Sequence, residues 1–147
     1  MTELPLDYLN KKEKNLSGGL ASFPLNNAID PKKLGSVKLN PTGEFEAGSY
    51  QTFEWIYTAG TFGIDDSGSI RICFRFASDQ GKPQFTDSKA PNYTTIVASN
   101  NAVLKYDYDP QGNVRPWGKT IYIRVVQGYL TEGETIKVVF GDRSEGS

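Results

Sequence analysis

Alternation of apolar and polar residues with a period of two is the feature that most constrains how this chain can fold. In residues 69–76, four apolar side chains fall on one face of an extended strand. They are Ile70, Ile72, Phe74 and Phe76. Arg71, Cys73 and Arg75 fall on the other face. A pattern of this kind predicts a strand with one buried side.

The same period recurs along the chain from Ser36 onward, and turn-forming residues separate the repeats. We expect about seven strands, at 36–40, 50–58, 69–76, 93–99, 102–108, 120–127 and 135–140. The residues "NN" between 93–99 and 102–108 are a turn signal that tolerates positive φ. No helical period follows residue 35. The fold class we predict is an all-β antiparallel sandwich, Ig-like in the broad sense, with a barrel as the alternative.

Residues 1–35 differ from the rest because they are polar and turn-rich and show no sustained period. We interpret them as an extended leader that wraps the domain or is partly disordered, with a short helix at 6–14 as an option. Residues 36–147 would then form a single sandwich domain, since 147 residues suit one domain.

Charge and cysteine content restrict the partners and the compartment. The chain has 16 basic and 17 acidic residues, so we expect neither nucleic acid nor an anionic membrane as a partner. No apolar run is long enough to span a bilayer. Cys73 is the single cysteine, which excludes an internal disulfide. Together with an N-terminus that lacks an apolar signal region, this favours a cytoplasmic location.

The sequence contains no histidine. Serine and cysteine triads normally use histidine as the base, and most catalytic zinc sites use it as a ligand. Glu44 and Glu46 lie two residues apart, as a carboxylate pair could, but Gly43 and Gly48 around them favour a flexible turn. We therefore expect no catalytic residue and no enzyme activity from this chain alone.

Two aspartate-containing loops are candidates for a calcium site. Asp65 and Asp66 stand in "IDDSGS", directly before the strand at 69–76. Aspartate and serine side chains bond nearby backbone groups and Gly68 supplies a permissive φ, so a tight turn is the favoured interpretation. As half of a calcium site, the two carboxylates would need ligands from another loop.

Residues 107–112, "DYDPQG", could supply those ligands from Asp107 and Asp109. The stretch departs from a calcium loop because Pro110 interrupts it, Gln111 stands at position five, and Gly118 stands where glutamate is needed. A strand end followed by an Asp-Pro turn is therefore favoured. We expect no cofactor, with calcium as the alternative.

Surface aromatics and one cysteine are the remaining candidates. The aromatics that could stack on sugars or bind a partner are Tyr106, Tyr108, Tyr122, Tyr129 and Trp117. Trp117 lies between Arg115 and Lys119 in a loop. Its side chain either folds back and plugs the end of the core or anchors an interface with a partner. Cys73 has arginines on both sides, which could activate a thiol, but without a base we interpret it as an ordinary strand cysteine.

Four motifs occur in order along the chain: G-I-D-D-x-G-x-I-R, F-R-x-x-x-D-x-G-x-P-Q, R-P-W-x-K and G-D-R-S. On these motifs, residues 47–147 resemble the N-terminal region of the bacterial DUF3604 family. The resemblance implies a larger protein, in which a domain similar to PHP-type metal-dependent phosphoesterases follows and binds metals through histidine and aspartate. None of those ligands lies in this chain, so no catalytic residue carries over.

The resemblance implies that this chain is a non-catalytic accessory domain of a larger metal-dependent hydrolase of unestablished function. Its partner would be the downstream domain of the same polypeptide. From position and residue type, we expect the interdomain or ligand surface to include Arg115, Trp117, Lys119, Asp142 and Arg143. The alternative function is a carbohydrate-binding module that uses surface aromatics, with an unknown sugar or small-molecule ligand.

Overall fold

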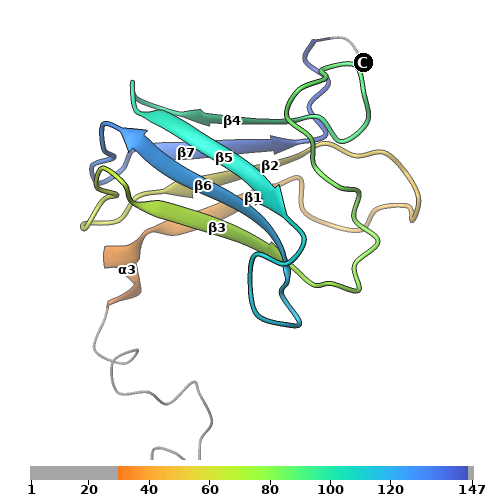
Figure 1. Cartoon of the computed structure of the whole chain (residues 1–147), viewed down its shortest axis with the longest axis horizontal. Coiled ribbons are helices and arrows are strands. Elements are labelled where there is room, and N and C mark those ends of the chain that lie inside the picture. The colour runs from red at the N-terminus through yellow and green to blue at the C-terminus, as the bar shows by residue number, and fades with distance from the viewer. Residues whose placement is uncertain (1–29, 146–147) are drawn as a thin grey trace, which may run out of the picture.

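The computed structural model describes residues 30–145, which form seven strands and one short helix (Figure 1). The elements are α3 (Pro31–Leu34), β1 (Ser36–Asn40), β2 (Phe53–Thr58), β3 (Ser69–Phe74), β4 (Thr94–Ala98), β5 (Val103–Asp109), β6 (Lys119–Gln127) and β7 (Thr135–Phe140). The prediction of an all-β protein with about seven strands is confirmed. The helix considered at 6–14 lies outside the described residues.

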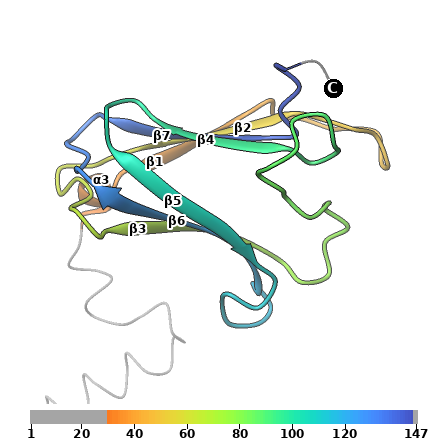
Figure 2. The same cartoon turned by 45° about the horizontal axis from the view of Figure 1, so that its top comes forward.

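The strands form two antiparallel sheets, one ordered β1-β2-β7-β4 and the other β3-β6-β5. Figure 2 shows the two sheets as separate layers. An immunoglobulin constant-type domain would have its fifth strand in the first sheet and its seventh in the second. Here β7 lies between β2 and β4, while β5 pairs with β6. The architecture is the expected sandwich, but these two strands have exchanged sheets.

Alternating residues of β6 and β7 form the centre of the core. On β6 the buried side chains are Ile121, Ile123 and Val125, and on β7 they are Ile136, Val138 and Phe140. Ile96 of β4 and Leu130 of the β6–β7 connection join them. Central strands have neighbours on both sides, so their inward residues lose nearly all contact with water. These are the same six inward residues that the period predicts for β6 and β7.

The residues that connect to β1 belong to the domain. Asp30 caps α3 by accepting a hydrogen bond from the backbone N–H of Lys32 at 3.0 Å. Tyr57 of β2 donates its hydroxyl hydrogen bond to the Leu34 carbonyl at 2.7 Å. Phe62 donates its N–H to the Lys33 carbonyl at 3.2 Å. The expected boundary at residue 36 marks the start of β1, but the preceding helical turn already binds the sandwich.

One local expectation was wrong. β3 ends at Phe74, so Phe76 does not continue its apolar face and is instead exposed, with its N–H donating to the Pro116 carbonyl at 2.8 Å. The "NN" segment connects β4 to β5 across the two sheets, and neither asparagine has a positive φ. Asn100 acts there through its side chain, which donates to the Tyr129 carbonyl at 2.8 Å.

Candidate functional site

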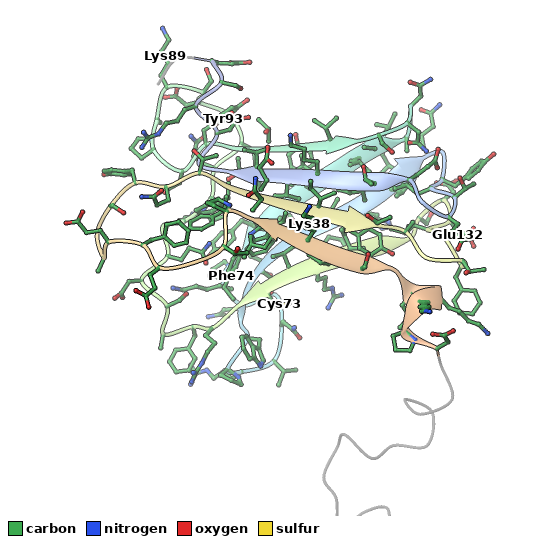
Figure 3. The ribbon with its side chains drawn as sticks, turned by 180° about the vertical axis from the view of Figure 1, so that it is seen from behind. Lys38, Cys73, Phe74, Lys89, Tyr93 and Glu132 are labelled. Carbon is green, nitrogen blue, oxygen red and sulfur yellow. The ribbon has the colours of Figure 1, made fainter. Side chains whose placement is uncertain are left out.

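A cleft of about 1090 Å³ lies at the end of the sandwich where β2 begins and β7 ends. Its walls are the loop 41–52, the loop 79–93 and residues 141–143. We call it the end cleft. Figure 3 shows Lys89 and Tyr93 at this end of the molecule, with Glu132 at the opposite end. Six aromatic side chains line the end cleft: Phe45, Tyr50, Phe53, Trp55, Tyr93 and Phe140.

Aromatic contacts connect the end cleft to the core. Trp55 lies 5.1 Å from Phe74, and Phe74 lies 6.5 Å from Phe140, measured between ring centroids. The Phe45 ring meets Phe53 edge to face at 5.1 Å, which holds the loop 41–52 against the start of β2. The indole N–H of Trp55 is buried and has no hydrogen-bond partner among the described residues. Buried donors of this kind are rare in folded proteins.

Gln84 shapes the second wall. Its side-chain carbonyl accepts hydrogen bonds from the N–H groups of Thr86 and Asp87, at 3.0 and 2.9 Å, and its amide donates to the Asp87 carbonyl at 2.6 Å. Its backbone also bonds Asn92 and Thr94. One residue therefore closes the loop that carries Lys89 and Tyr93, through both its side chain and its backbone. No sequence motif indicated this role, because the partners are backbone groups.

Asp142 and Arg143, two of the residues expected at a ligand surface, line the end cleft. Asp142 accepts a hydrogen bond from the Thr95 hydroxyl at 2.6 Å and another from the Ser144 N–H at 2.8 Å. The Thr95 hydrogen bond is the main reason why the pKa of Asp142 lies below its ordinary value. Arg143 is exposed. The structure thus fixes the carboxylate, whereas the exposed Arg143 side chain has no hydrogen-bond or ion-pair partner among residues 30–145.

The other three residues expected at a ligand surface do not line the end cleft. Arg115 and Trp117 are in the β5–β6 loop, and Lys119 is the first residue of β6. Trp117 is 49% exposed, so it does not plug the core. The Arg115 guanidinium lies 5.8 Å from the centroid of the exposed Phe76 ring. Lys119 donates to the Ser78 carbonyl at 2.7 Å. We call the exposed residues Phe76, Val114, Arg115 and Trp117 the Trp117 surface.

The aspartate candidates are not brought together. Asp65 and Asp66 lie just before Ser69, at the start of β3. Asp109 lies near the other end of β3, because Asp109 and Cys73 both pair with Thr120 of β6. From Ser69 to Cys73 the strand spans roughly 13 Å. Within residues 30–145, no group of three or more histidine, cysteine, aspartate or glutamate side chains could hold a metal ion.

Both aspartate segments form turns. Gly68 donates to the Asp65 carbonyl at 2.8 Å, and Asp109 accepts from the Gln111 N–H at 2.8 Å, while Asp107 is exposed on β5. One detail of the prediction was wrong: Ser67, with a φ of 71°, takes the left-handed position rather than Gly68. Gly68 is needed for space, because a Cβ there would lie 2.5 Å from the Ile64 side chain.

The aromatic candidates divide by face. The core side of β5 carries Tyr106 and Tyr108, which pack against the core and so do not form a binding surface. The Phe85 ring contacts Tyr106 edge to face, with the ring centroids 5.0 Å apart. Tyr122 lies on the outer face, 5.2 Å from the Arg71 guanidinium. Tyr129 is exposed in the β6–β7 connection, at the opposite end from the end cleft. The expected aromatic surface is therefore not continuous.

The remaining candidates are isolated. Glu44 and Glu46 are exposed in the loop 41–52, and of the two only Glu46 lines the end cleft. Cys73 is half-buried, and its sulfur accepts a hydrogen bond from the Asn113 amide at 3.1 Å. The aromatic lining of the end cleft was missed because its members come from four segments: the loop 41–52, β2, the loop 79–93 and β7.

Within the described residues, no helix has the length and apolar character needed to cross a bilayer. Comparison of the chain with protein-family models, with curated proteins and with solved structures finds no match.

Proposed function

We propose that this chain is a non-catalytic accessory β-sandwich module of a larger hydrolase, and that it packs against the catalytic domain through the Trp117 surface. The observation that carries the proposal is the exposure of Trp117, Val114 and Phe76 on two adjacent loops, which meet where Arg115 lies over the Phe76 ring. Interfaces are enriched in aromatic residues and arginine, and a half-exposed tryptophan is a common anchor.

The position of this surface supports the same proposal. The loop with Phe76 follows β3, and the loop with Trp117 leads into β6. Both lie at the end of the sandwich where Phe74 contacts Phe140, the last residue of β7. Figure 1 shows the C-terminal segment at this same end. In the family that the sequence resembles, the catalytic domain follows this region. A domain attached there would lie within reach of both the Trp117 surface and Arg143.

The test compares Trp117→Ala with Tyr129→Ala in a polypeptide that contains both domains. Tyr129 is a matched control because it is also an exposed aromatic residue but lies at the opposite end. We expect Trp117→Ala to increase proteolytic cleavage between the domains and to uncouple their thermal transitions, while Tyr129→Ala behaves like the wild type. Equal behaviour of the two variants would contradict the proposal.

A second candidate is a carbohydrate-binding module that uses the end cleft. Aromatic side chains that stack on sugar rings, beside polar groups that orient the ligand, are the usual composition of such sites. The end cleft combines Tyr50 and Phe45 at its exposed rim with Glu46, Asn92 and Arg143.

The two tryptophans allow a selective test, because Trp55 lines the end cleft and Trp117 does not. In a Trp117→Phe variant, fluorescence reports Trp55 alone. A shift on adding a polysaccharide, abolished by Tyr50→Ala, would support binding in the end cleft. The titration is run against a polysaccharide panel, with and without a calcium chelator. No shift with any polysaccharide would count against this function.

A further inference from the structure

The inner face of β1 carries two apolar side chains that are open to solvent. Val37 of β1 pairs with Tyr57 of β2, and residues directly opposite in an antiparallel pair lie on the same face of the sheet. Leu39 pairs in the same way with Trp55. Because Tyr57 and Trp55 pack against the core, Val37 and Leu39 also point to the inner side of the sandwich. They are nevertheless 68% and 42% exposed.

These side chains are exposed because the second sheet is one strand narrower than the first. Trp55 of β2 contacts Phe74 of β3, with the ring centroids 5.1 Å apart. Within residues 30–145, β3 pairs only with β6 and forms the edge of its sheet, so no strand lies opposite Leu39. Figures 1 and 3 show β1 and β3 along the same side of the molecule. A strip one strand wide is therefore open beside β3.

The backbone of β3 offers hydrogen-bonding groups to this strip. The Val125 N–H donates to the Gly68 carbonyl at 2.9 Å, which fixes which residues of β3 face β6. Because successive residues of a strand direct their N–H and C=O groups to opposite sides, those of Ser69, Arg71 and Cys73 point away from β6. An exposed edge of this kind is where an extended segment of another molecule can pair.

The outer side of the same edge is basic. Arg71 and Arg124 are exposed there, and residues 69–76 contain two arginines and no acidic residue. Asp107 lies on the same face, but two strands away on β5. Within residues 30–145, Arg71 forms no ion pair. Opposite charges on neighbouring strands attract, so an acidic side chain is favoured at the position beside Arg71 in any added strand.

Charge also favours a different protein over a second copy of this chain. If β3 paired with β3 of a second copy, both Arg71 side chains would lie on the same face of the new pair, where like charges repel. A strand with a period of two would instead direct acidic side chains towards Arg71 and apolar side chains towards Val37 and Leu39. Such a strand is complementary to both faces of the edge.

We propose that β3 binds an extended segment of a partner protein as a fourth strand of the second sheet, and that apolar residues alternate with acidic residues in this segment. The backbone groups of Arg71 and Cys73 hold its main chain, and the Arg71 side chain pairs with its carboxylates. Its apolar side chains cover Val37 and Leu39. The proposal does not depend on the Trp117 surface or on a ligand in the end cleft.

Binding of a synthetic peptide to the isotope-labelled full chain, followed by NMR, tests the proposal. The probe is a blocked peptide of sequence Glu-Val-Glu-Val-Glu-Val-Glu, and the control peptide has lysine in place of each glutamate. At pH 7 the glutamate peptide should bind roughly tenfold more tightly and should shift and protect the amides of Ser69, Arg71 and Cys73. The chain has a net charge of −1, so a general attraction would not produce this preference.

Three results of this titration would overturn the proposal. They are equal binding of the two peptides, binding of neither peptide, and amide shifts confined to β4 or β5. In the free chain, protection of the Arg71 and Cys73 amides that rises with protein concentration would assign the edge to a second copy. Protection that is independent of concentration would show that the chain itself already occupies the edge. Either result would also overturn the proposal.

Two variants separate the charged and apolar contributions. Arg71→Glu should reverse the preference, so that the lysine peptide binds this variant more tightly than the glutamate peptide does. Val37→Asn should weaken binding of the glutamate peptide roughly tenfold, because the inward apolar contact is lost. Val97→Asn is the matched control, since Val97 is 62% exposed on the other edge strand of the first sheet, and it should bind like the wild type.

Urea unfolding of each variant separates a loss of binding from a loss of fold. All three changes are at exposed positions, so the variants should unfold close to the wild type. Equal binding by Val37→Asn and Val97→Asn, or an unchanged peptide preference in a folded Arg71→Glu variant, would contradict the proposed site.

Discussion

The Thr95 hydroxyl donates a hydrogen bond to the Asp142 carboxylate over 2.6 Å, and this contact attaches the segment after β7 to β4. Asp142 also donates its own N–H to the Tyr93 carbonyl at 2.8 Å. One residue therefore joins two walls of the end cleft. The ionised carboxylate of Asp142 accepts from Thr95 and Ser144, so its charge state affects how the segment after β7 is held.

The first prediction concerns pH. The pKa of Asp142 is lowered in the folded protein, mainly by Thr95, so its contribution to stability is present above the unfolded pKa of about 3.9 and is lost as pH falls through the folded pKa. Thr95→Val should cost about 1 kcal/mol of unfolding free energy at pH 7 and raise the pKa of Asp142 towards its ordinary value.

An NMR titration of the Asp142 carboxyl group in both proteins, with urea unfolding at pH 7 and pH 3, checks this prediction. The stability difference between wild type and Thr95→Val should shrink at the lower pH. A pKa for Asp142 that is the same in the two proteins would show that the hydrogen bond does not stabilise the ionised form.

The second prediction separates the two tryptophans. Trp55→Ala removes a ring packed on Phe74, and we expect a loss of about 3 kcal/mol in unfolding free energy. Trp117→Ala removes a half-exposed ring and should cost less than about 1 kcal/mol in this chain. Chemical denaturation followed by circular dichroism measures both. Similar losses for the two variants would mean that Trp117 supports the core.

The third prediction concerns the turn before β3. Gly68→Ala places a Cβ 2.5 Å from the Ile64 side chain and 2.8 Å from the Asp65 carbonyl, which should cost about 1–3 kcal/mol. Ser67→Gly removes the strain of a non-glycine residue in the left-handed region but increases the conformational entropy of the unfolded chain. The free energy of unfolding should therefore change by no more than about 0.5 kcal/mol. Thermal unfolding of both variants is the measurement. If Ser67→Gly were the more damaging, the assignment of the two positions would be wrong.

The fourth prediction concerns the connection between the sheets. Asn100 donates to the Tyr129 carbonyl and to the Glu134 carboxylate, each at 2.8 Å, and accepts from the Ala102 N–H at 2.9 Å. Asn100→Ala should cost about 1–3 kcal/mol, because several partly buried groups lose a partner. Asn101→Ala, a change at the exposed neighbour, should have little effect when compared by urea unfolding. Equal losses would contradict the role of Asn100.

Local pattern predicted most of the strands and their inner faces. For β6 and β7, the inward residues such as Ile123 and Val138 follow from the sequence, because side chains alternate across any extended strand whatever its neighbours are. Turn chemistry likewise predicted the segments around Asp65 and Asp109, since the hydrogen bonds there join residues only two or three positions apart.

The candidate site could not be predicted in the same way. Tyr106 and Trp117 are equally aromatic in sequence, yet one packs on the core and the other is half-exposed, because exposure depends on which distant segments arrive beside them. Arg115 and Arg143 lie on different loops, and the distance between those loops follows from the packing of the strands that carry them. Sequence spacing does not encode such distances.

The sequence by itself determined that this chain forms strands, which side of each strand faces inward and where the tight turns fall, because these properties depend on neighbouring residues. Only the tertiary structure decided that β7 lies between β2 and β4, that Phe74 and Phe140 meet, and that an aromatic cleft opens at that end. Strand order depends on long-range pairing, and many orders can bury the same alternating faces.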